Sequence, residues 1–309
     1  MSSSSPEMPS ALLALSNNLA DVVEQVGHSV VTVQGRSRLS SSGVHWRSRI
    51  VVTADETIKR SEDITVTLPD GRTVPATLVG RDPSTDIAVL KLQDVELPVA
   101  EIGEASLLKV GHVVLAVGRP SESGLSASMG VVSAISGSWR SSYGGLIDQF
   151  VRLDLNLYPN LEGGPLVEAS GRVVGITVSG PRRTVITIPA STINRVVDQL
   201  LAKGHIARGY LGLGMQPVRL PETLKNTLNL SSLGGVIVIN VESDGPADKS
   251  GVLIGDVLVA IDGTPVSDTS DIQAILGSQT LGKTLNVQIV RGGTLVEVAL
   301  TVGERQGKE

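Results

Sequence analysis

The sequence predicts a mainly β protein, in which a larger all-β domain is followed by a small mixed α+β domain. The length of 309 residues favours two domains over one. Beyond residue 29, short segments of alternating apolar and polar side chains recur up to about residue 190 without helical patterns between them. Many short strands of this kind are typical of a sandwich or of barrels. The 34 glycines supply the turns that such strands need.

The composition is that of a globular protein with an aliphatic core. Hydrophobic residues make up 41% of the chain but aromatic residues only 2%, so Val, Ile and Leu must fill the interior. Acidic residues outnumber basic residues by 31 to 26, which argues against a nucleic-acid partner. The chain has no cysteine, which excludes disulfides and thiolate chemistry. No cofactor is expected.

Residues 1–28 are expected to form a short tail and an amphipathic helix. The apolar residues of this helix share one face, and Gly27 follows as a stop: Leu12, Leu15, Leu19, Val22, Val23 and Val26. Because basic residues are few, we expect this face to pack on its own barrel or on a sister subunit, with no membrane contact. Neither a signal peptide nor a run near the roughly 18 apolar residues of a membrane span is evident, which favours a cytoplasmic protein.

Residues 29–190 are expected to form the all-β domain. Its clearest element is a hairpin, because Ile64–Leu68 and Val74–Leu78 alternate on either side of the turn Pro69-Asp70-Gly71. The further strand candidates are Val31–Val33, Ile50–Thr53, Ile87–Leu92, Val113–Val117, Met129–Ile135, Phe150–Leu155, Leu166–Val167, Val173–Val178 and Thr184–Ile188.

Residues 191–208 are expected to form a linker helix that opens at Ser191 and ends at Gly204. Residues 209–309 then form the second domain. We expect its strands at Val236–Val241, Val257–Ile261, Leu285–Val290 and Leu295–Val302, with a helix that Thr269 or Ser270 caps.

Three stretches of the first domain resemble the landmarks of trypsin-like proteases of the HtrA/Deg group, whose triad runs His, Asp, Ser along the chain. The stretch Thr53–Glu56 stands where that group has T-A-x-H, and Pro159–Leu166 where it has P-G-x-S-G-G-P-L. Asp82–Lys91 reads D-P-S-T-D-I-A-V-L-K and matches the segment of the triad Asp closely. The resemblance implies a chymotrypsin-like double β-barrel.

The second domain resembles a bacterial PDZ domain. Gly209–Leu213 is similar to its carboxylate-binding loop, and Ser243–Ala247 and Gly255–Leu258 are similar to its core. The resemblance implies that Tyr210, Leu211, Gly212 and Leu213 bind an extended peptide by β-augmentation. It therefore implies that the partners are peptides or unfolded protein segments, and that the PDZ domain binds C-terminal peptides. Whether the chain forms a homo-oligomer stays open.

At two of the three triad positions, the matching residue is unsuited to proteolysis. Glu56 stands at the position of the His and Glu162 at that of the Ser, while Asp86 is retained. A carboxylate cannot attack a peptide carbonyl and turn over as a hydroxyl does, nor can it shuttle a proton as an imidazole does near neutral pH. Losing the nucleophile or the base costs about 10⁶ in turnover in a comparable triad enzyme.

The loop around Glu162 carries a third change. In the family, the residue two before the nucleophile is usually Gly, and its N–H is half of the oxyanion hole. Here Asn160 holds that position, followed after Glu162 by the family's Gly163 and Gly164. The leading hypothesis is therefore a pseudoprotease that binds peptides or protein partners.

Two alternatives stay open, and both depend on Glu56, Asp86 and Glu162 converging as the resemblance implies. The three carboxyl groups would run acid–base hydrolysis through a water molecule, or they would hold a hard divalent cation such as Ca²⁺, Mg²⁺ or Mn²⁺ in a structural subunit. The four histidines are expected at edges or on the surface, where none replaces the lost base: His28, His45, His112 and His205.

Overall fold

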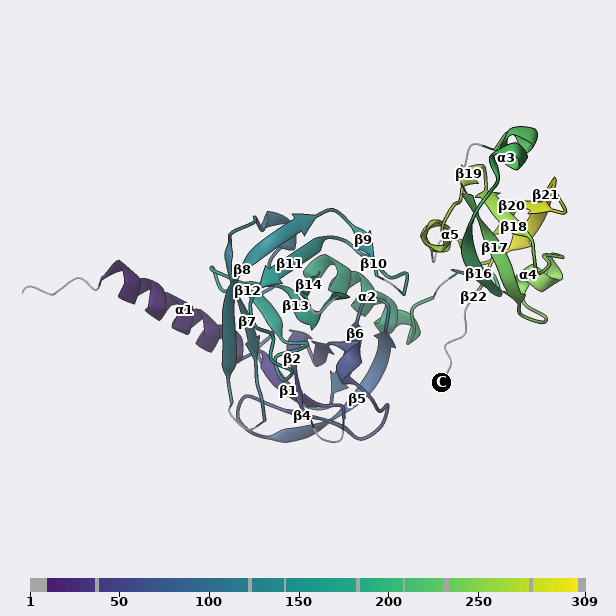
Figure 1. Cartoon of the computed structure of the whole chain (residues 1–309). Coiled ribbons are helices and arrows are strands. Elements are labelled where there is room, and N and C mark those ends of the chain that lie inside the picture. Colours follow the sequence, from purple (N-terminus) through teal and green to yellow (C-terminus); the bar gives the residue numbers. More distant parts are fainter. Residues whose placement is uncertain are drawn as a thin grey trace, which may run out of the picture. The chain divides into compact units, whose positions relative to one another are not determined.

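The computed structural model describes residues 10–36, 39–121, 124–141, 143–181, 184–207, 209–230, 234–277 and 280–304 (Figure 1). The chain divides into two compact units, one ending at Ile206 and the other beginning at Ala207. The first nine residues of the expected tail lie outside the described part. Within that part, no helix combines the length and the apolar character that a membrane span requires.

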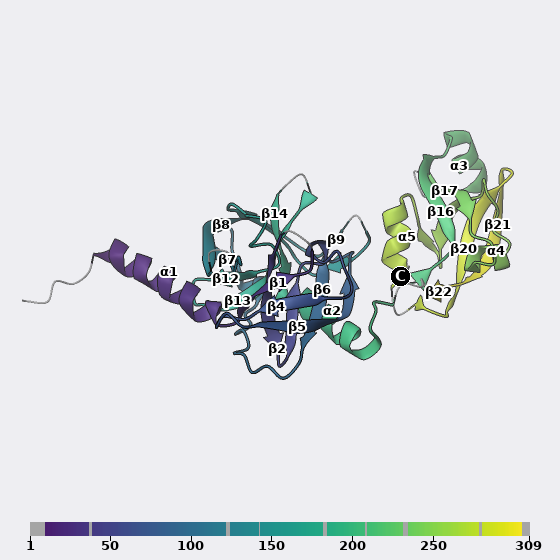
Figure 2. The same ribbon diagram turned by 90° about the horizontal axis from the view of Figure 1, so that it is seen from below.

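The first unit begins with helix α1 (Ala11–Gly27), as the apolar periodicity predicts. The hydroxyl of Ser10 caps it by accepting a hydrogen bond from the N–H of Leu13 at 3.2 Å. Only the last turns of α1 pack on the barrels, through Leu19, Val22, Val23 and Val26. Its first turns extend away from them (Figures 1 and 2), and Leu12 is 76% exposed.

The first barrel is closed, in the order β1-β2-β3-β6-β5-β4. Its strands are β1 (Val30–Gln34), β2 (Ser41–Arg47), β3 (Ile50–Thr53), β4 (Ile64–Thr67), β5 (Thr73–Asp82) and β6 (Ile87–Leu92). The predicted hairpin is β4–β5, with Val66 opposite Val74. The short 3₁₀ turn η1 (Asp55–Thr57) follows β3.

The second barrel is also closed, in the order β11-β14-β13-β12-β7-β8. Its strands are β7 (Val113–Gly118), β8 (Ser126–Ser136), β11 (Phe150–Asp154), β12 (Pro165–Glu168), β13 (Val173–Ser179) and β14 (Val185–Pro189). A 3₁₀ turn, η2 (Ala105–Leu107), precedes it, and β9 (Trp139–Arg140) pairs with β10 (Leu146–Ile147) beside it. The two closed barrels confirm the double-barrel prediction.

Helix α2 (Ala190–Lys203) lies on the barrels and ends at Gly204, which takes the left-handed conformation at φ 75°. Ile193, Val196 and Leu200 are buried in the core that both barrels share. The indole N–H of Trp46 on β2 donates to the side-chain oxygen of Asn194 at 2.8 Å. The helix that the sequence suggests as a linker thus forms part of the first unit.

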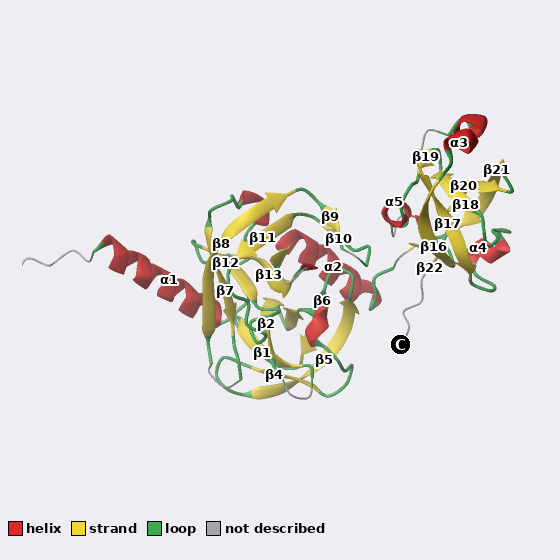
Figure 3. Cartoon of the chain, in the orientation of Figure 1, coloured by secondary structure: helices red, strands yellow, loops and turns green. Residues whose placement is uncertain are grey.

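The second unit is a small α+β domain, as predicted. Its sheet has the order β16-β17-β18-β20-β21, with β16 (Leu213–Arg219) at one edge (Figure 3). The other strands are β17 (Gly234–Val241), β18 (Val257–Ile261), β20 (Thr284–Arg291) and β21 (Thr294–Thr301). Short β15 (Gly209–Tyr210) pairs with β22 (Gly303–Glu304), and β19 (Thr264–Pro265) with β18.

Three helices complete the second unit: α3 (Glu222–Leu228), α4 (Pro246–Lys249) and α5 (Thr269–Ile275). The prediction that Thr269 or Ser270 caps α5 is wrong by one position. Asp268 is the cap: its carboxylate accepts the N–H of Ser270 at 2.9 Å, and Asp271 closes a capping box with it. An ionised carboxylate makes a stronger acceptor for helix N–H groups than a hydroxyl does.

Candidate functional site

The turn after β3 positions Glu56. The hydroxyl of Thr57 donates to the backbone oxygen of Ala54 at 2.7 Å and holds the turn closed. Asp55 is 5% exposed and forms an ion pair with Arg81 of β5, whereas Glu56 is exposed. Burial raises the pKa of Asp55, and the bond from Arg81 opposes that rise. Asp55 therefore anchors the turn, and the neighbouring carboxylate faces outward.

Asp86 lies in the tight connection between β5 and β6. It takes the left-handed conformation, at φ 56°, which Asp tolerates better than most residues. Its neighbour Asp82 stabilises the turn by accepting the hydroxyls of Ser84 at 2.7 Å and Thr85 at 2.8 Å. The Oδ1 of Asp86 accepts the backbone N–H of Glu56 at 2.8 Å.

The environment of Asp86 raises its pKa from 3.8 to about 7. Burial is the largest cause, and the hydrogen bond from the Glu56 N–H opposes it. The negative charges of Glu162, Asp55 and Glu56 raise the pKa further. The carboxyl groups of Glu56 and Glu162 thus both lie within electrostatic reach of Asp86.

Glu162 does not point to solvent. It is 9% exposed, and its Oε1 accepts the backbone N–H of Ser179, the last residue of β13, at 3.1 Å. Its backbone oxygen accepts the N–H of Ser42 at 3.1 Å. The carboxylate therefore joins its loop to the end of β13.

The two glycines after Glu162 are required by packing. Gly163 has φ 79°, and a Cβ there would lie 2.5 Å from the Oγ1 of Thr53. A Cβ on Gly164 would lie 2.2 Å from the backbone oxygen of Val117. Both distances are shorter than any side chain tolerates, so this loop needs glycine independently of any catalytic role.

Asn160 does not adopt the left-handed backbone that its glycine-like position suggests; its φ is not positive. Its carbonyl oxygen accepts the hydroxyl of Ser42 at 2.7 Å. Within the described residues, the N–H groups of Asn160 and Glu162 have no hydrogen-bond acceptor. These two amides, which the sequence resemblance assigns to an oxyanion hole, are thus unpaired in the described part of the chain.

Two further residues near this loop were not identified as site residues from the sequence. The hydroxyl of Ser42 accepts the N–H of Arg119 at 2.9 Å as well as donating to Asn160, so both of its hydrogen-bonding roles are taken. Ser179 takes part through its backbone N–H. No sequence pattern indicates a role for either residue, because both contacts form between segments that are far apart in the sequence.

His45 is buried, at 2% exposure, so its expected edge or surface location is wrong. Its Nε2 accepts the N–H of Arg49 at 3.0 Å, and its Nδ1 lies 3.0 Å from the backbone oxygen of Pro98, to which it donates. Burial lowers the pKa of His45, and both ring nitrogens are occupied. His45 is thus a structural residue and no substitute base.

No group of three or more histidine and acidic side chains in the described ranges is arranged to hold a metal ion. The carboxylate of Glu162 faces a backbone N–H, and that of Asp86 faces the N–H of Glu56. In each carboxylate, one oxygen is thus engaged by a peptide group.

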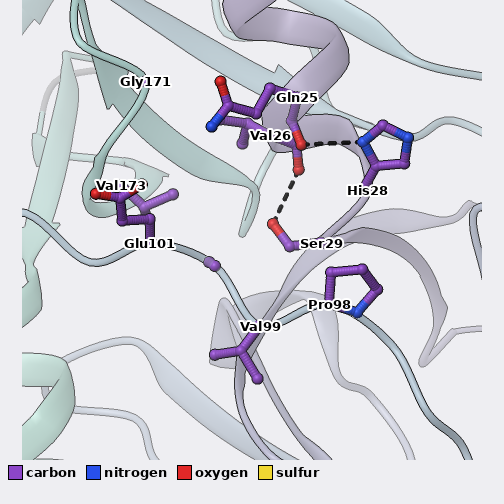
Figure 4. Close-up of a pocket in the computed structure, with 10 residues that line it drawn as sticks. Gln25, Val26, His28, Ser29, Pro98, Val99, Glu101, Gly171 and Val173 are labelled. Carbon is purple, nitrogen blue, oxygen red and sulfur yellow. Dashed lines mark hydrogen bonds between the residues drawn. The ribbon is translucent and has the colours of Figure 1, made fainter.

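A hollow of about 300 Å³ lies elsewhere on the first unit, between the end of α1 and residues 98–101 (Figure 4). Two of its polar side chains are bonded within the fold: the hydroxyl of Ser29 donates to the backbone oxygen of Val26 at 2.8 Å, and His28 contacts the oxygen of Gln25. None of the three carboxyl groups lines it.

The candidate peptide site of the second unit starts at β15. Gly212 has φ 76°, and its oxygen accepts the N–H of Glu242 at 2.9 Å. The oxygen of Leu211 accepts the N–H of Ala247 at 2.9 Å, and the hydroxyl of Tyr210 donates to the carboxylate of Glu242. The loop is thereby fixed at the start of β16.

The hydrogen bonds of β17 establish which groups of β16 face its free edge. Val238 donates to Asp256 and accepts from Gly255, so its peptide groups face β18. Its partner in the register is Met215, whose peptide groups therefore face away from β17. By the period of two, those of Leu213 and Pro217 do the same. The side chains of Leu213 and Met215 share an apolar cluster with Ile275 of α5.

Both units match known domains. A trypsin-like peptidase domain matches residues 41–176, and a PDZ domain matches residues 209–302. A probable periplasmic serine endoprotease DegP-like from Pseudomonas fulva is 34% identical over 279 residues, which cover 87% of this chain and 57% of the relative. A protein of the same name from Brucella suis is 32% identical over 284 residues, with 89% and 53% covered. The chain spans little more than half the length of these relatives.

The names of these relatives overturn the expected cytoplasmic location, since they are described as periplasmic. The expectation depended on the lack of a recognisable signal peptide. Because such a segment is removed from mature proteins, its absence carries no weight, and a chain without cysteine suits any compartment.

Solved structures extend the likeness over both units. The serine endoprotease from Yersinia pestis has a TM-score of 0.75 at 28% identity, covering 97% of this chain and all of its own. The HtrA-type protease AlgW with tripeptide has a TM-score of 0.72 at 30% identity, covering 94% of this chain and 98% of its own. A relative matched so completely, and in the same domain order, shows that this chain belongs to the HtrA/Deg family of trypsin-like, PDZ-bearing serine proteases.

Proposed function

We propose that this chain is a pseudoprotease of the HtrA/Deg family, which binds the C-terminal ends of peptides or unfolded proteins through its PDZ domain. The observation that carries the proposal is the position of Glu162. The resemblance of Pro159–Leu166 to the family's nucleophile segment supports this assignment, and the side chain present is a carboxylate that is 9% exposed and bonded to the N–H of Ser179. A group used in this way serves the fold rather than the chemistry of peptide cleavage.

The surroundings of Glu162 support the same conclusion. In a serine protease triad, the Asp orients an imidazole that accepts the proton of the nucleophile. Asp86 here accepts the backbone N–H of Glu56, whose side chain has no ring. The site lacks both the hydroxyl that would attack and the base that would activate it.

Support for peptide binding comes from the second unit. The edge of β16 is free within the sheet, beside α5, and the Gly209–Leu213 loop lies at its start. Terminal carboxylates bind to backbone N–H groups of such loops, while the peptide adds a strand to the edge. Two HtrA-type structures similar to this chain are described with a decapeptide and with a tripeptide. The relatives' names extend the proposed role to the periplasm.

Degradation of unfolded casein tests the proposal. The native chain is compared with a restored variant that combines Glu56→His, Asn160→Gly and Glu162→Ser. We expect the native chain to be inert and the restored variant to cleave, because the barrels around the site are complete. Glu56→His alone is the matched control and should stay inert, since it lacks a nucleophile. Hydrolysis by the native chain that Glu162→Gln abolishes would overturn the proposal.

One observation favours a second candidate, an acid–base hydrolase. The pKa of Asp86, at about 7, keeps that carboxyl group partly protonated near neutral pH, as a general acid requires. A pH profile of hydrolysis tests this candidate: activity between pH 5 and 7 that Asp86→Asn removes would support it, and a flat baseline would reject it.

A further inference from the structure

The free edge of β16 offers fewer backbone hydrogen bonds toward its C-terminal end than at its start. Leu213 and Met215 each present an N–H and a C=O to this edge, but Pro217, in the same phase, has only its C=O to offer. An added antiparallel strand exchanges bonds with every second residue. Pairing with a peptide is therefore complete at Leu213 and Met215 and incomplete at Pro217.

The position of the carboxylate-binding loop sets the register of the peptide. Because Gly209–Leu213 precedes β16, a peptide bound there by its terminal carboxylate runs antiparallel to the strand. With its last residue opposite Leu213, the residues two and four positions upstream lie opposite Met215 and Pro217. The fourth upstream residue of the peptide therefore makes only one of its two backbone hydrogen bonds, because Pro217 has no N–H.

A hollow of about 630 Å³ lies at this end of β16. Its walls are the end of β16, the start of α3 and the residue that precedes the cap of α5: among them Pro217, Arg219, Glu222, Lys225 and Ser267, which we call the upstream subsite. The volume is within the roughly 300–1,000 Å³ of small-ligand pockets.

Two cationic side chains line the upstream subsite. The side chain of Lys225 is 9% exposed, and its ammonium lies 2.7 Å from Glu222, whose side chain is 78% exposed. An ammonium group has three donors, so a second acceptor can approach from the hollow. Arg219 is exposed and has no ion pair among the described residues.

Two acidic residues that follow the lining residue Ser267 in sequence are engaged by the cap of α5. Asp268 accepts the N–H of Ser270, and Asp271 accepts the N–H of Ser267, both within the cap of α5. Neither carboxylate lines the hollow. The lining side chains therefore carry two positive charges and one negative charge, a balance that favours an acidic ligand group.

We propose that the upstream subsite selects an acidic side chain four to six residues before the C-terminus of a bound peptide. This inference depends on the proposed function, since the terminal carboxylate fixes the register. The domain recognises the last three residues of the peptide through backbone hydrogen bonds. It recognises the residues before them through the charge of their side chains.

Fluorescence anisotropy with the full chain tests the proposal on three pools of labelled decapeptides. Each pool has its last four residues randomised and the three residues before them fixed as Asp, Ala or Lys. We expect the Asp pool to bind about threefold to tenfold more tightly than the Ala pool, and the Lys pool more weakly than both. Pools with amidated C-termini measure the terminal contact.

The outcomes separate the two proposals. If free-acid and amidated pools bind alike, C-terminal capture and the proposed function fail. If the free-acid pools bind, but with equal affinity, only the upstream subsite fails.

Variants locate the effect. Lys225→Met and Arg219→Gln should each reduce the preference for Asp while leaving the Ala pool unchanged, and Lys283→Met, on an exposed lysine of the same unit, is the matched control. Because Lys225 is buried, thermal unfolding checks that its variant is folded; the exposed Arg219→Gln provides a test that does not depend on this. A preference for Asp that survives both variants would overturn the assignment.

Discussion

The Oδ1 of Asp86 accepts the backbone N–H of Glu56 at 2.8 Å, so the turn after β3 is bonded to the connection between β5 and β6. The bond uses the peptide group of Glu56 and ignores its side chain. Any residue other than proline at position 56 provides this N–H, so the connection between the two turns does not depend on the side chain of Glu56.

The raised pKa of Asp86 predicts how stability changes with pH. A carboxyl group whose folded-state pKa lies above its unfolded value binds more protons in the folded state. The free energy of unfolding therefore falls as pH rises from about 4 to about 7 and levels off above that range. Asp86→Asn keeps an oxygen for the Glu56 N–H but cannot ionise. The loss of unfolding free energy between pH 4 and pH 7 should therefore be smaller in this variant than in the native chain, by roughly 1–4 kcal/mol.

Urea unfolding at pH 5, 6, 7 and 8 measures this pH dependence of the unfolding free energy. Asp70→Asn is the control, since the pKa of Asp70 is lowered by its bonds to Arg72; equal slopes in the native chain and Asp86→Asn would contradict the assignment.

The contact between Glu162 and Ser179 predicts a structural role for the carboxylate. Glu162→Ala leaves the N–H of Ser179 without its acceptor and should lower the free energy of unfolding by about 1–3 kcal/mol. Glu162→Gln keeps an acceptor oxygen and should cost less. Glu56→Ala, on an exposed side chain, should stay within about 0.5 kcal/mol of the native chain. Chemical unfolding of the three variants provides the comparison, and an equal effect of the two alanine variants would argue against the role.

The packing around Gly163 predicts that an alanine there lowers the free energy of unfolding by more than backbone strain alone would. Gly163 and Gly71 have similar φ values, 79° and 87°, but a Cβ at Gly71 meets open space while one at Gly163 meets Thr53 and Ser42. Gly71→Ala should cost about 1–2 kcal/mol through backbone strain. Gly163→Ala should cost at least about 1–3 kcal/mol more through overpacking. If thermal unfolding finds the two variants equally destabilised, the close approach of the barrels is not what requires Gly163.

The missing donor at Pro217 predicts a gain of affinity on substitution. Pro217→Ala restores an N–H to the free edge of β16, opposite the fourth residue upstream of the peptide C-terminus. A decapeptide from the Ala pool should then bind about two- to tenfold more tightly, the value of one added hydrogen bond. A tripeptide with the same C-terminal residues ends before that position and should bind unchanged. A gain for both peptides, or for neither, would refute the proposed register.

Local patterns predict much of this fold. The alternation around Pro69-Asp70-Gly71 predicts β4 and β5, and the apolar face from Leu12 to Val26 predicts α1, because both depend on neighbours in sequence. The short helices α3 and α4, with 7 and 4 residues, were not predicted, since one or two turns show too little periodicity.

The candidate site is less accessible to prediction. The family motif identifies Glu56, Asp86 and Glu162, but it does not reveal that the carboxylate of Glu162 accepts the N–H of Ser179 or that the oxygen of Asn160 accepts the hydroxyl of Ser42. Each contact joins a loop to a strand distant in sequence. The predicted exposure of His45 was wrong for the same reason. Residues 97–100 cover its side chain, and the sequence around His45 gives no sign of this contact.

The open edge of β16 exposes unpaired peptide groups to every extended chain in its surroundings, including other copies of the same domain. A strand that offered donors along its whole length would be a template on which such copies stack into fibrils. The missing N–H at Pro217 interrupts the row of donors along this edge, which disfavours stacking of this kind while the proposed contact at Leu213 and Met215 keeps its backbone partners.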